Sequence, residues 1–305
     1  MNKLRNIYFN PEDPGSFGGT ERLWRASGHA TRKAVKEFLH SQEAYARHKQ
    51  YFSKFKRRKV MVPHSNYLWQ ADLVFMRKYK RFNKSFQYIL TVIDCFSRYA
   101  FAVPIRSKHS EEIIRAFSLI FKSYNHKPKF LECDRGSEFY NSKFQKFLRN
   151  HSIILYSNHS DLKACIVERW NRTLLTRISK YFTATGQFDY INVLDAIVRS
   201  YNKSFHRSIG TEPINVGRNN ESDVWLHLYK DLFTRPCKKP NLKLYDQVRL
   251  SKIKQLFQKG YSTTYTSEVF QISEVLDTIP ITYKVKDRNG ETLGGIFYEQ
   301  ELIKI

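Results

Sequence analysis

The chain has 305 residues, 41% of them hydrophobic and 15% aromatic, which exceeds one ordinary domain and excludes an intrinsically disordered protein. Its 52 Lys and Arg residues outnumber its 28 Asp and Glu residues, and the net charge of +24 favours a polyanion such as nucleic acid as partner. The alternative is a charge that serves solubility alone, but solubility needs only about 2 to 8 on a small domain.

Residues 1–59 are expected to form a helical module that ends in a basic linker. A Pro- and Gly-rich opening precedes two helical patterns that begin at Thr20 and Thr31, and threonine is a common helix cap. The second pattern has an apolar stripe surrounded by basic residues, so we expect a small helix-turn-helix that binds DNA. The alternative is a helical appendage with a solvated basic face. The run 54–59 indicates a basic linker or a nuclear address.

The region 60–216 is expected to form one α/β domain. Apolar and β-branched runs predict strands at 68–76, 86–93, 100–105, 129–133 and 153–156. A basic turn at 77–84 joins the first two strands in a hairpin, and helices are predicted from Ser110, through Phe144 to Leu148, after the polar loop 157–161, and near 191–201. Three strands followed by alternating helices and strands predict a mixed sheet.

The remainder is expected to be a linker and a small barrel. The segment 217–242 is rich in Asn, Lys and Pro and indicates a linker. Short alternating strands in 243–305, with a hairpin at Asn289-Gly290, predict an SH3-like β-barrel. Lysines at 252, 254 and 259 would give this barrel a basic surface.

The cysteines exclude two classes of protein. The four of them, Cys95, Cys133, Cys165 and Cys237, stand singly, so neither a disulfide framework nor a zinc knuckle is indicated. The chain is therefore expected to be intracellular. No apolar run reaches the length of a membrane span, so we expect neither secretion nor a membrane anchor.

Three carboxylates fall where a mixed sheet can bring them together. Asp72 lies within the first strand, Asp134 ends the fourth, and Glu168 lies in the first turns of the long helix. Three acids without a cationic partner repel one another unless divalent cations neutralise them, and oxygen ligands suit Mg²⁺ or Mn²⁺. Two such ions can activate an attacking oxygen and stabilise the leaving oxygen of a phosphodiester. Taken singly, each acid would more often be a strand end or a helix surface residue than a catalytic one.

Several motifs around these acids resemble the catalytic core of retroviral-type integrases. They are Trp69-Gln-Ala-Asp72, Thr91-Val-Ile-Asp-Cys-Phe-Ser-Arg98, Cys133-Asp-Arg-Gly-Ser-Glu-Phe139 and Val167-Glu-Arg-Trp-Asn-Arg-Thr-Leu174. Tyr201-Asn202, His206, Ser208, Gly210 and Pro213 resemble the end of that core. The resemblance covers Asn66 to about Val216. It implies a ribonuclease-H-like core with a mixed five-stranded sheet, and it implies that Asp72, Asp134 and Glu168 form the metal-binding catalytic triad.

The first module narrows the resemblance and also departs from the retroviral pattern. Its Ser16-Phe-Gly-Gly19 and Gln42-Glu-Ala-Tyr45 resemble integrases of Polinton (Maverick) elements and virophages. The 33 residues between Asp134 and Glu168 (135–167) form a shorter spacing than is usual in retroviral integrases. Retroviral integrases also carry a His-His-Cys-Cys zinc module in front, but no cysteine precedes Cys95 here, so no zinc is expected.

Other polar residues lie near the triad in the sequence. Arg172 lies one turn beyond Glu168 and could hold a DNA phosphate, or it could form an intrahelical salt bridge to Glu168. Asn171 and Lys163 are further candidates for contact with DNA. Asp94 and Glu138 are expected to lie outside the triad. Asp94 belongs to the family pattern but is expected to cap a turn.

These observations predict a DNA integrase of a mobile element or virus. It would process the 3′ ends of element DNA and transfer them into target DNA with two Mg²⁺ or Mn²⁺ ions per active site, as a homo-oligomer, by resemblance a tetramer. If the host is eukaryotic, we expect the protein in the nucleus. Packaging in a virus particle is compatible with the same prediction. One alternative is a ribonuclease-H-like nuclease that only hydrolyses. Another is a domesticated, transposon-derived DNA-binding protein without catalysis.

Overall fold

The computed structural model describes the chain except for residues 1, 29, 50–54, 158–163, 235–238 and 253–262. The chain divides into two compact units. One unit is Val60–Arg235, and the other combines Met1–Lys59 with Pro236–Ile305. No helix in the described segments is both long and apolar enough to span a membrane.

The unit Val60–Arg235 is built on a five-stranded sheet in the order β3-β2-β1-β4-β5. The strands are β1 (Leu68–Phe75), β2 (Tyr88–Asp94), β3 (Ala100–Ile105), β4 (Phe130–Cys133) and β5 (Ile154–Tyr156). β1 pairs antiparallel with β2 and parallel with β4, so the sheet is mixed, as the sequence predicted. The turn between β1 and β2 is a short 3₁₀ helix, Arg77–Phe82.

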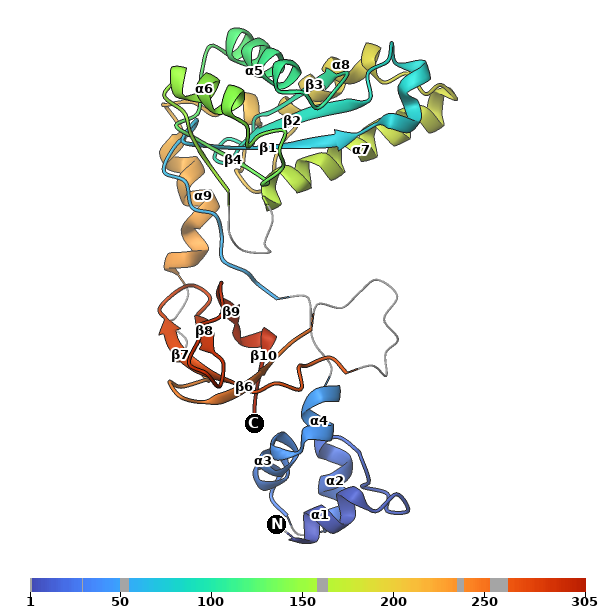
Figure 1. Ribbon diagram of the computed structural model, residues 1–305, viewed down its shortest axis with the longest axis vertical. Helices are drawn as coiled ribbons and strands as arrows, with labels where there is room; N and C mark the ends of the chain where they lie inside the picture. Colours follow the sequence, from blue (N-terminus) through green and yellow to red (C-terminus); the bar gives the residue numbers. More distant parts are fainter. Residues whose placement is uncertain (1, 29, 50–54, 158–163, 235–238, 253–262) are drawn as a thin grey trace. The chain divides into compact units, whose positions relative to one another are not determined.

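Helices cover both faces of this sheet. They are α5 (Ser110–Tyr124), α6 (Ser142–Asn150), α7 (Cys165–Thr185) and α8 (Ile191–Asn202). Side chains alternate along β1, so Trp69 and Leu73 pack against α5 and α6, whereas Val74 packs against α7 and α8. In Figure 1, α5 and α6 lie above the sheet and α7 below it. Gln70 and Asp72, which share the parity of Val74, therefore belong to the α7 face.

The segment predicted as a linker, 217–242, differs in the structure. Helix α9 (Glu221–Phe233) occupies half of it and follows a short 3₁₀ helix, Pro213–Asn215. Val224, Leu228 and Tyr229 are buried in one cluster with Val62 and Phe96. These apolar residues recur at helical spacing, so the unit continues through α9. The composition of Asn, Lys and Pro around the helix masked that periodicity.

Two predicted helix starts shift by one residue, and one is confirmed. Thr31 caps α3, because its Oγ1 accepts a hydrogen bond from Ala34 N at 3.2 Å. Thr20 is instead the first residue of α2, capped by Gly19, and Ser110 is the first residue of α5, capped by His109. Neither Gly19 nor His109 forms a side-chain capping hydrogen bond, and both have an extended backbone. The helices therefore begin at the residue after this extended backbone.

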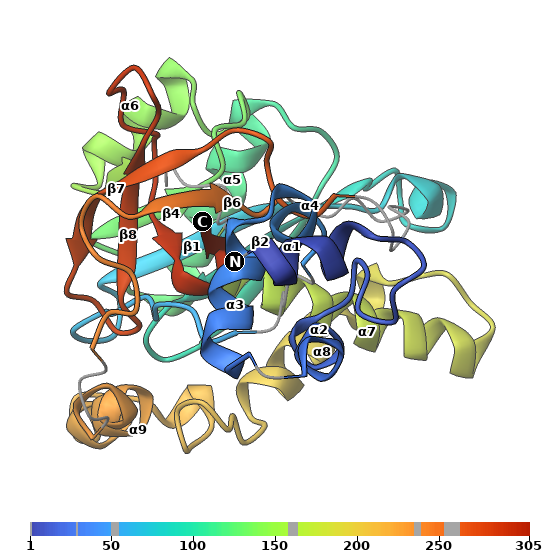
Figure 2. The same ribbon diagram turned by 90° about the horizontal axis from the view of Figure 1, so that it is seen from below.

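The second unit contains the N-terminal helices and an antiparallel sheet. The helices are α1 (Asn2–Phe9), α2 (Thr20–Ser27), α3 (Arg32–Ser41) and α4 (Glu43–His48). The sheet has the order β10-β6-β7-β8-β9 and comprises β6 (Gln247–Leu250), β7 (Phe270–Leu276), β8 (Thr282–Lys286), β9 (Phe297–Tyr298) and β10 (Leu302–Lys304), with a 3₁₀ turn at Glu299–Glu301. β6, β7 and β8 lie side by side in Figures 1 and 2.

The predicted hairpin of the small sheet is present. Gly290 has a φ of +87°, a conformation that glycine adopts without steric cost, and Lys286 pairs with Thr292 across the turn. Of the three lysines expected on this module, Lys252 is described, and positions 254 and 259 lie outside the described residues.

Candidate active site

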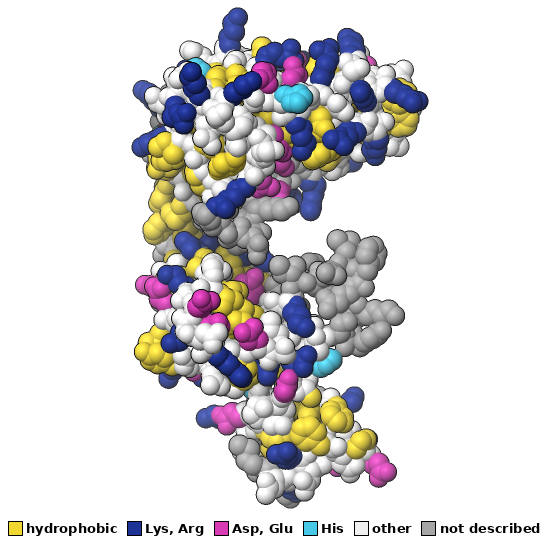
Figure 3. Space-filling model, in the orientation of Figure 1, with side chains coloured by type: hydrophobic (Ala, Val, Ile, Leu, Met, Phe, Trp, Pro, Cys, Tyr) yellow, Lys and Arg dark blue, Asp and Glu magenta, His cyan; other side chains and the backbone are white. Residues whose placement is uncertain are grey.

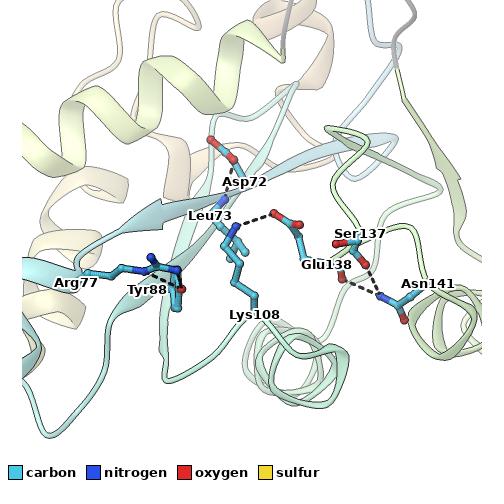
Figure 4. A network of polar contacts seen from close by, with 8 residues as sticks. All are labelled: Asp72, Leu73, Arg77, Tyr88, Lys108, Ser137, Glu138 and Asn141. Carbon is cyan, nitrogen blue, oxygen red and sulfur yellow. Dashed lines mark hydrogen bonds and ion pairs between the residues drawn. The ribbon is translucent and has the colours of Figure 1, made fainter.

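Asp72 occupies the centre of the candidate site. It lies on β1, opposite Thr91 of β2, and its side chain is half-buried. Its Oδ1 accepts a hydrogen bond from Leu73 N at 2.7 Å, and its Oδ2 accepts one from Asn171 Nδ2 at 2.7 Å. Figure 4 shows Asp72 at the strand, below the ribbon of the long helix. The second bond therefore joins the central strand to α7.

Asp134 reaches the same place through strand pairing. Ala71 of β1 is the partner of Cys133 of β4 in a parallel register. Asp72 and Asp134 are the residues that follow this pair, so they emerge next to each other at one edge of two neighbouring strands. Asp134 is exposed, as expected for the residue after the end of a strand.

Glu168 is held near the two aspartates by the start of α7. Gln70, which is only 1% exposed, accepts hydrogen bonds at its Oε1 from Ile166 N and Val167 N, both at 3.0 Å. These are N–H groups of the first helical turn, which have no partner inside the helix. Gln70 Nε2 donates to Oε2 of the buried Glu132 at 2.8 Å. A single side chain thus links β1, β4 and the turn that carries Glu168.

The charges of the three acids act on one another. Burial raises the pKa of the Asp72 carboxyl, and the negative charges of Asp134 and Glu168 raise it further. The hydrogen bonds from Leu73 N and Asn171 oppose this rise. The three predicted triad residues therefore share one electrostatic environment, in which the ionised form of Asp72 is less favoured than in water and a cation would stabilise it.

A buried acceptor lies in the same environment. The side-chain Oδ1 of Asn171 is buried and has no hydrogen-bond partner in the described part of the chain. An oxygen left without a donor beside a carboxylate suits a hard cation or a water bound to it. The described residues hold no group of three or more His, Cys, Asp or Glu side chains already positioned as ligands, and Asp134 and Glu168 are both exposed. The donor chemistry of the three acids and Asn171 fits a divalent ion.

Of the DNA-contact candidates, Asn171 contacts the triad directly, as described above. Arg172 is exposed and lines a cavity of about 780 Å³ on α7 together with Leu175 and Thr176. No ion pair with Glu168 is found among the described residues, which disfavours the salt-bridge alternative. Lys163 lies outside the described residues.

Asp94 caps a turn. It is fully buried, and its carboxylate accepts hydrogen bonds from Phe96 N, from Ser97 N and Oγ, and from Asn66 N. Three of these four donors lie in the turn itself and the fourth, Asn66 N, precedes β1, so Asp94 fixes the path of the chain between β2 and β3 and ties it to the start of β1.

Glu138 is paired with a lysine. Its Oε1 lies 3.4 Å from Lys108 Nζ, and Lys108 also lies 4.4 Å from the centre of the Phe75 ring. Figure 4 shows the pair beside the strand that carries Asp72. Glu138 thus has a cationic partner in Lys108, whereas Asp134 and Glu168 are the acids whose charges act on Asp72.

The sequence analysis missed two residues of this site, Gln70 and Glu132. Gln70 could have been found, because it lies two residues before Asp72 and a strand places both on the same face. Glu132 could not, because nothing in its local sequence shows that it is buried 2.8 Å from an amide.

Part of the unit Val60–Arg235 is similar to a known protein family. Residues 62–157 match the family described as integrase core domain. This segment is therefore similar to an integrase core domain. The matched segment includes Asp72 and Asp134 and ends before Glu168.

Three known proteins are similar to this chain over longer or overlapping segments. An uncharacterized transposon-derived protein of Caenorhabditis elegans is 34% identical over 199 residues, which cover 64% of this chain and 65% of that protein. The chain thus spans about two thirds of the length of this relative. A chain of the simian T-cell lymphotropic virus intasome, solved in complex with PP2A regulatory subunit B56 gamma, has a TM-score of 0.66 at 15% identity and is similar over 99% of this chain and 98% of that one. The HTLV-2 integrase catalytic core domain, solved in complex with magnesium, is similar over 50% of this chain and 97% of that one, at 21% identity and a TM-score of 0.43.

These findings confirm the predicted fold class. The core is the ribonuclease-H-like α/β fold of integrases, accompanied by N-terminal helices and a C-terminal five-stranded antiparallel sheet. The narrower likeness to Polinton and virophage integrases is untested by these comparisons and stays a prediction.

Proposed function

We propose that this protein is a DNA integrase that cleaves near the 3′ ends of a mobile element and joins the new ends to target DNA. The observation that carries the proposal is the convergence of Asp72, Asp134 and Glu168 from two strands and a helix into one electrostatic environment. The family match supports a polynucleotidyl transferase. The transposon-derived relative supports a role in a mobile element.

Asp72, Asp134 and Glu168 would hold Mg²⁺ or Mn²⁺ in this proposal. Two bound ions would supply activation of the attacking oxygen and stabilisation of the leaving oxygen. Asn171 orients the Asp72 carboxylate through its 2.7 Å hydrogen bond. Gln70 fixes the first turn of α7 and with it the position of Glu168. Hydrolysis and joining need the same carboxylates, because only the attacking oxygen differs between them.

The basic surface would hold the DNA. Figure 3 shows Lys and Arg side chains spread over the visible face of the unit Val60–Arg235. We propose that Arg172, on the exposed face of α7, contacts a phosphate next to the triad, and that the first 59 residues and the 243–305 module add further DNA contacts. Joining two element ends to one target requires a homo-oligomer, which we propose to be a tetramer acting in the nucleus of a eukaryotic host.

The test uses the purified chain with Mg²⁺ and labelled duplexes that carry the terminal repeats flanking its gene. We expect shortened 3′ ends and, with added plasmid, labelled joined products. Shortened ends without joined products would favour a nuclease that only hydrolyses. DNA binding without either product would favour a domesticated DNA-binding protein.

A further inference from the structure

The flank of α7 opposite the triad carries a second cluster of polar side chains. At 100° per residue, Glu168 and Asn171 lie on one flank of the helix. Cys165, Arg169 and Arg177 lie on the other, separated by multiples of four residues. This second flank borders a cavity of about 410 Å³ between α7, the turn after β2 and the segment 204–208.

Cations and hydroxyls line this cavity. Its charged and polar lining includes Arg98, Arg169, Arg177, Ser204, His206 and Ser208. None of the described residues around it is acidic. Three guanidinium groups that share a cavity without a carboxylate repel one another, and an anion would relieve that repulsion.

Arg98 provides an independent indication of a missing partner. Its Nη1 is buried and has no hydrogen-bond acceptor in the segments that the structure describes. A buried guanidinium N–H without an acceptor is costly, and such groups are uncommon in folded proteins. Arg98 is held in place by the turn that Asp94 caps, and its φ of +61° fixes the direction in which it leaves the backbone.

The histidine in the cavity is neutral. Burial, together with the positive charges of Arg98 and Arg169, lowers the pKa of His206 to about 4. Its Nδ1 accepts a hydrogen bond from Ser208 N at 3.3 Å, so the ring proton is on Nε2. The cavity therefore carries three positive charges from its arginines and additional donors from its serine hydroxyls.

We propose that this cavity binds a phosphate group. Guanidinium groups suit phosphate because their planar fork donates two parallel hydrogen bonds to its oxygens. The phosphate could come from a DNA backbone or from a small free phosphate, and the chemistry that recognises it is the same. Only the DNA source rests on the proposed function, since the cavity shares no residue with the triad.

The first arm of the test uses inorganic phosphate and the full chain. Thermal melting in phosphate, against sodium chloride at matched ionic strength, should show a rise in Tm that grows with phosphate concentration. Arg169→Gln should lose this rise and fold normally, because Arg169 is exposed. Arg199→Gln removes an exposed arginine of α8 that does not line the cavity and should keep the rise. Arg98→Gln should also lose it.

The second arm measures DNA affinity against salt for the same variants. If a backbone phosphate occupies the cavity, Arg169→Gln should reduce the slope of log K against log salt by about 0.9, and Arg199→Gln should not. Loss of the phosphate response with an unchanged slope assigns the cavity to a free phosphate. If Arg169→Gln leaves both the salt slope and the phosphate response unchanged, the proposal is overturned. It is also overturned if Arg199→Gln loses as much of the phosphate response as Arg169→Gln does. Asp72→Asn should retain the phosphate response, which separates this proposal from the catalytic one.

Discussion

Asn171 Nδ2 lies 2.7 Å from Oδ2 of Asp72 and links helix α7 to the central strand β1 of the five-stranded mixed sheet. The bond lowers the pKa of the Asp72 carboxyl, whereas burial and the charges of Asp134 and Glu168 raise it. The amide therefore helps to keep Asp72 ionised at the pH where a cation must bind. It also fixes one of the two oxygens that a cation would use.

Asn171→Leu tests this relationship. The variant keeps the branching of the side chain at Cγ but removes the donor, so the pKa of Asp72 should rise. The acid limb of the pH profile for end cleavage should then move to higher pH, and activity at neutral pH should fall by about 10- to 100-fold, as for other residues that orient metal ligands. Asn150→Leu, at the exposed end of α6, is the control. An acid limb that stays in place would contradict the assigned role.

Gln70→Leu should destabilise the core. The change leaves two N–H groups of α7 and the buried Glu132 carboxylate without their partner, and each unsatisfied group costs about 1–3 kcal/mol. Urea denaturation should show a lower midpoint with an unchanged slope. Gln187→Leu, at an exposed position, should leave the midpoint near that of the wild type. Equal midpoints for Gln70→Leu and the wild type would show that the helix start does not depend on this amide.

The sequence was sufficient for the sheet and the positions of the acids, but not for the contacts between elements. Strand periodicity and motif order placed Asp72, Asp134 and Glu168 on the right elements. The link from Gln70 to α7 joins residues 96 positions apart, which no local pattern reveals. Helix α9 was missed because the Asn-, Lys- and Pro-rich composition around it masked the helical spacing of its apolar residues.

Arg172→Ala should weaken DNA binding without affecting metal binding. The side chain is exposed on α7, and loss of one phosphate contact should reduce the salt slope of DNA affinity by about 0.9. Arg149→Ala removes an exposed arginine of α6 and is the matched control. If the salt slope of DNA affinity falls equally in both variants, Arg172 contributes only to the general positive field.

The N-terminal helices should fold without zinc. Their core is apolar, formed by Leu4, Tyr8, Leu23, Val35 and Phe38 among others, and no cysteine precedes Cys95. Adding a chelator to the full chain should leave the helical signal unchanged, and elemental analysis should find less than stoichiometric zinc. Zinc at one equivalent per chain would refute this expectation.

The central prediction concerns the triad. Asp72→Asn, Asp134→Asn and Glu168→Gln should each reduce end cleavage and joining together by more than about 100-fold, since loss of a metal ligand should cost at least as much as loss of a residue that orients one. Each amide keeps the shape of the acid but removes a negative oxygen ligand that a hard cation requires. DNA binding should persist in all three variants. Near-normal joining by any one of them would remove that residue from the triad.

Asp72→Asn should raise the thermal stability of the metal-free protein, although it lowers activity. Because the folded pKa of Asp72 is raised, protonation of this carboxyl favours the folded state, and that contribution is lost as pH rises through the folded pKa. At neutral pH the metal-free variant should therefore melt at a higher temperature than the wild type. The difference should disappear below the pKa of Asp72 in the unfolded chain, where both proteins are neutral at this position. Melting curves in a chelator at pH 3 and pH 7 measure both ends, and a Tm difference that is the same at the two values would contradict the electrostatic origin.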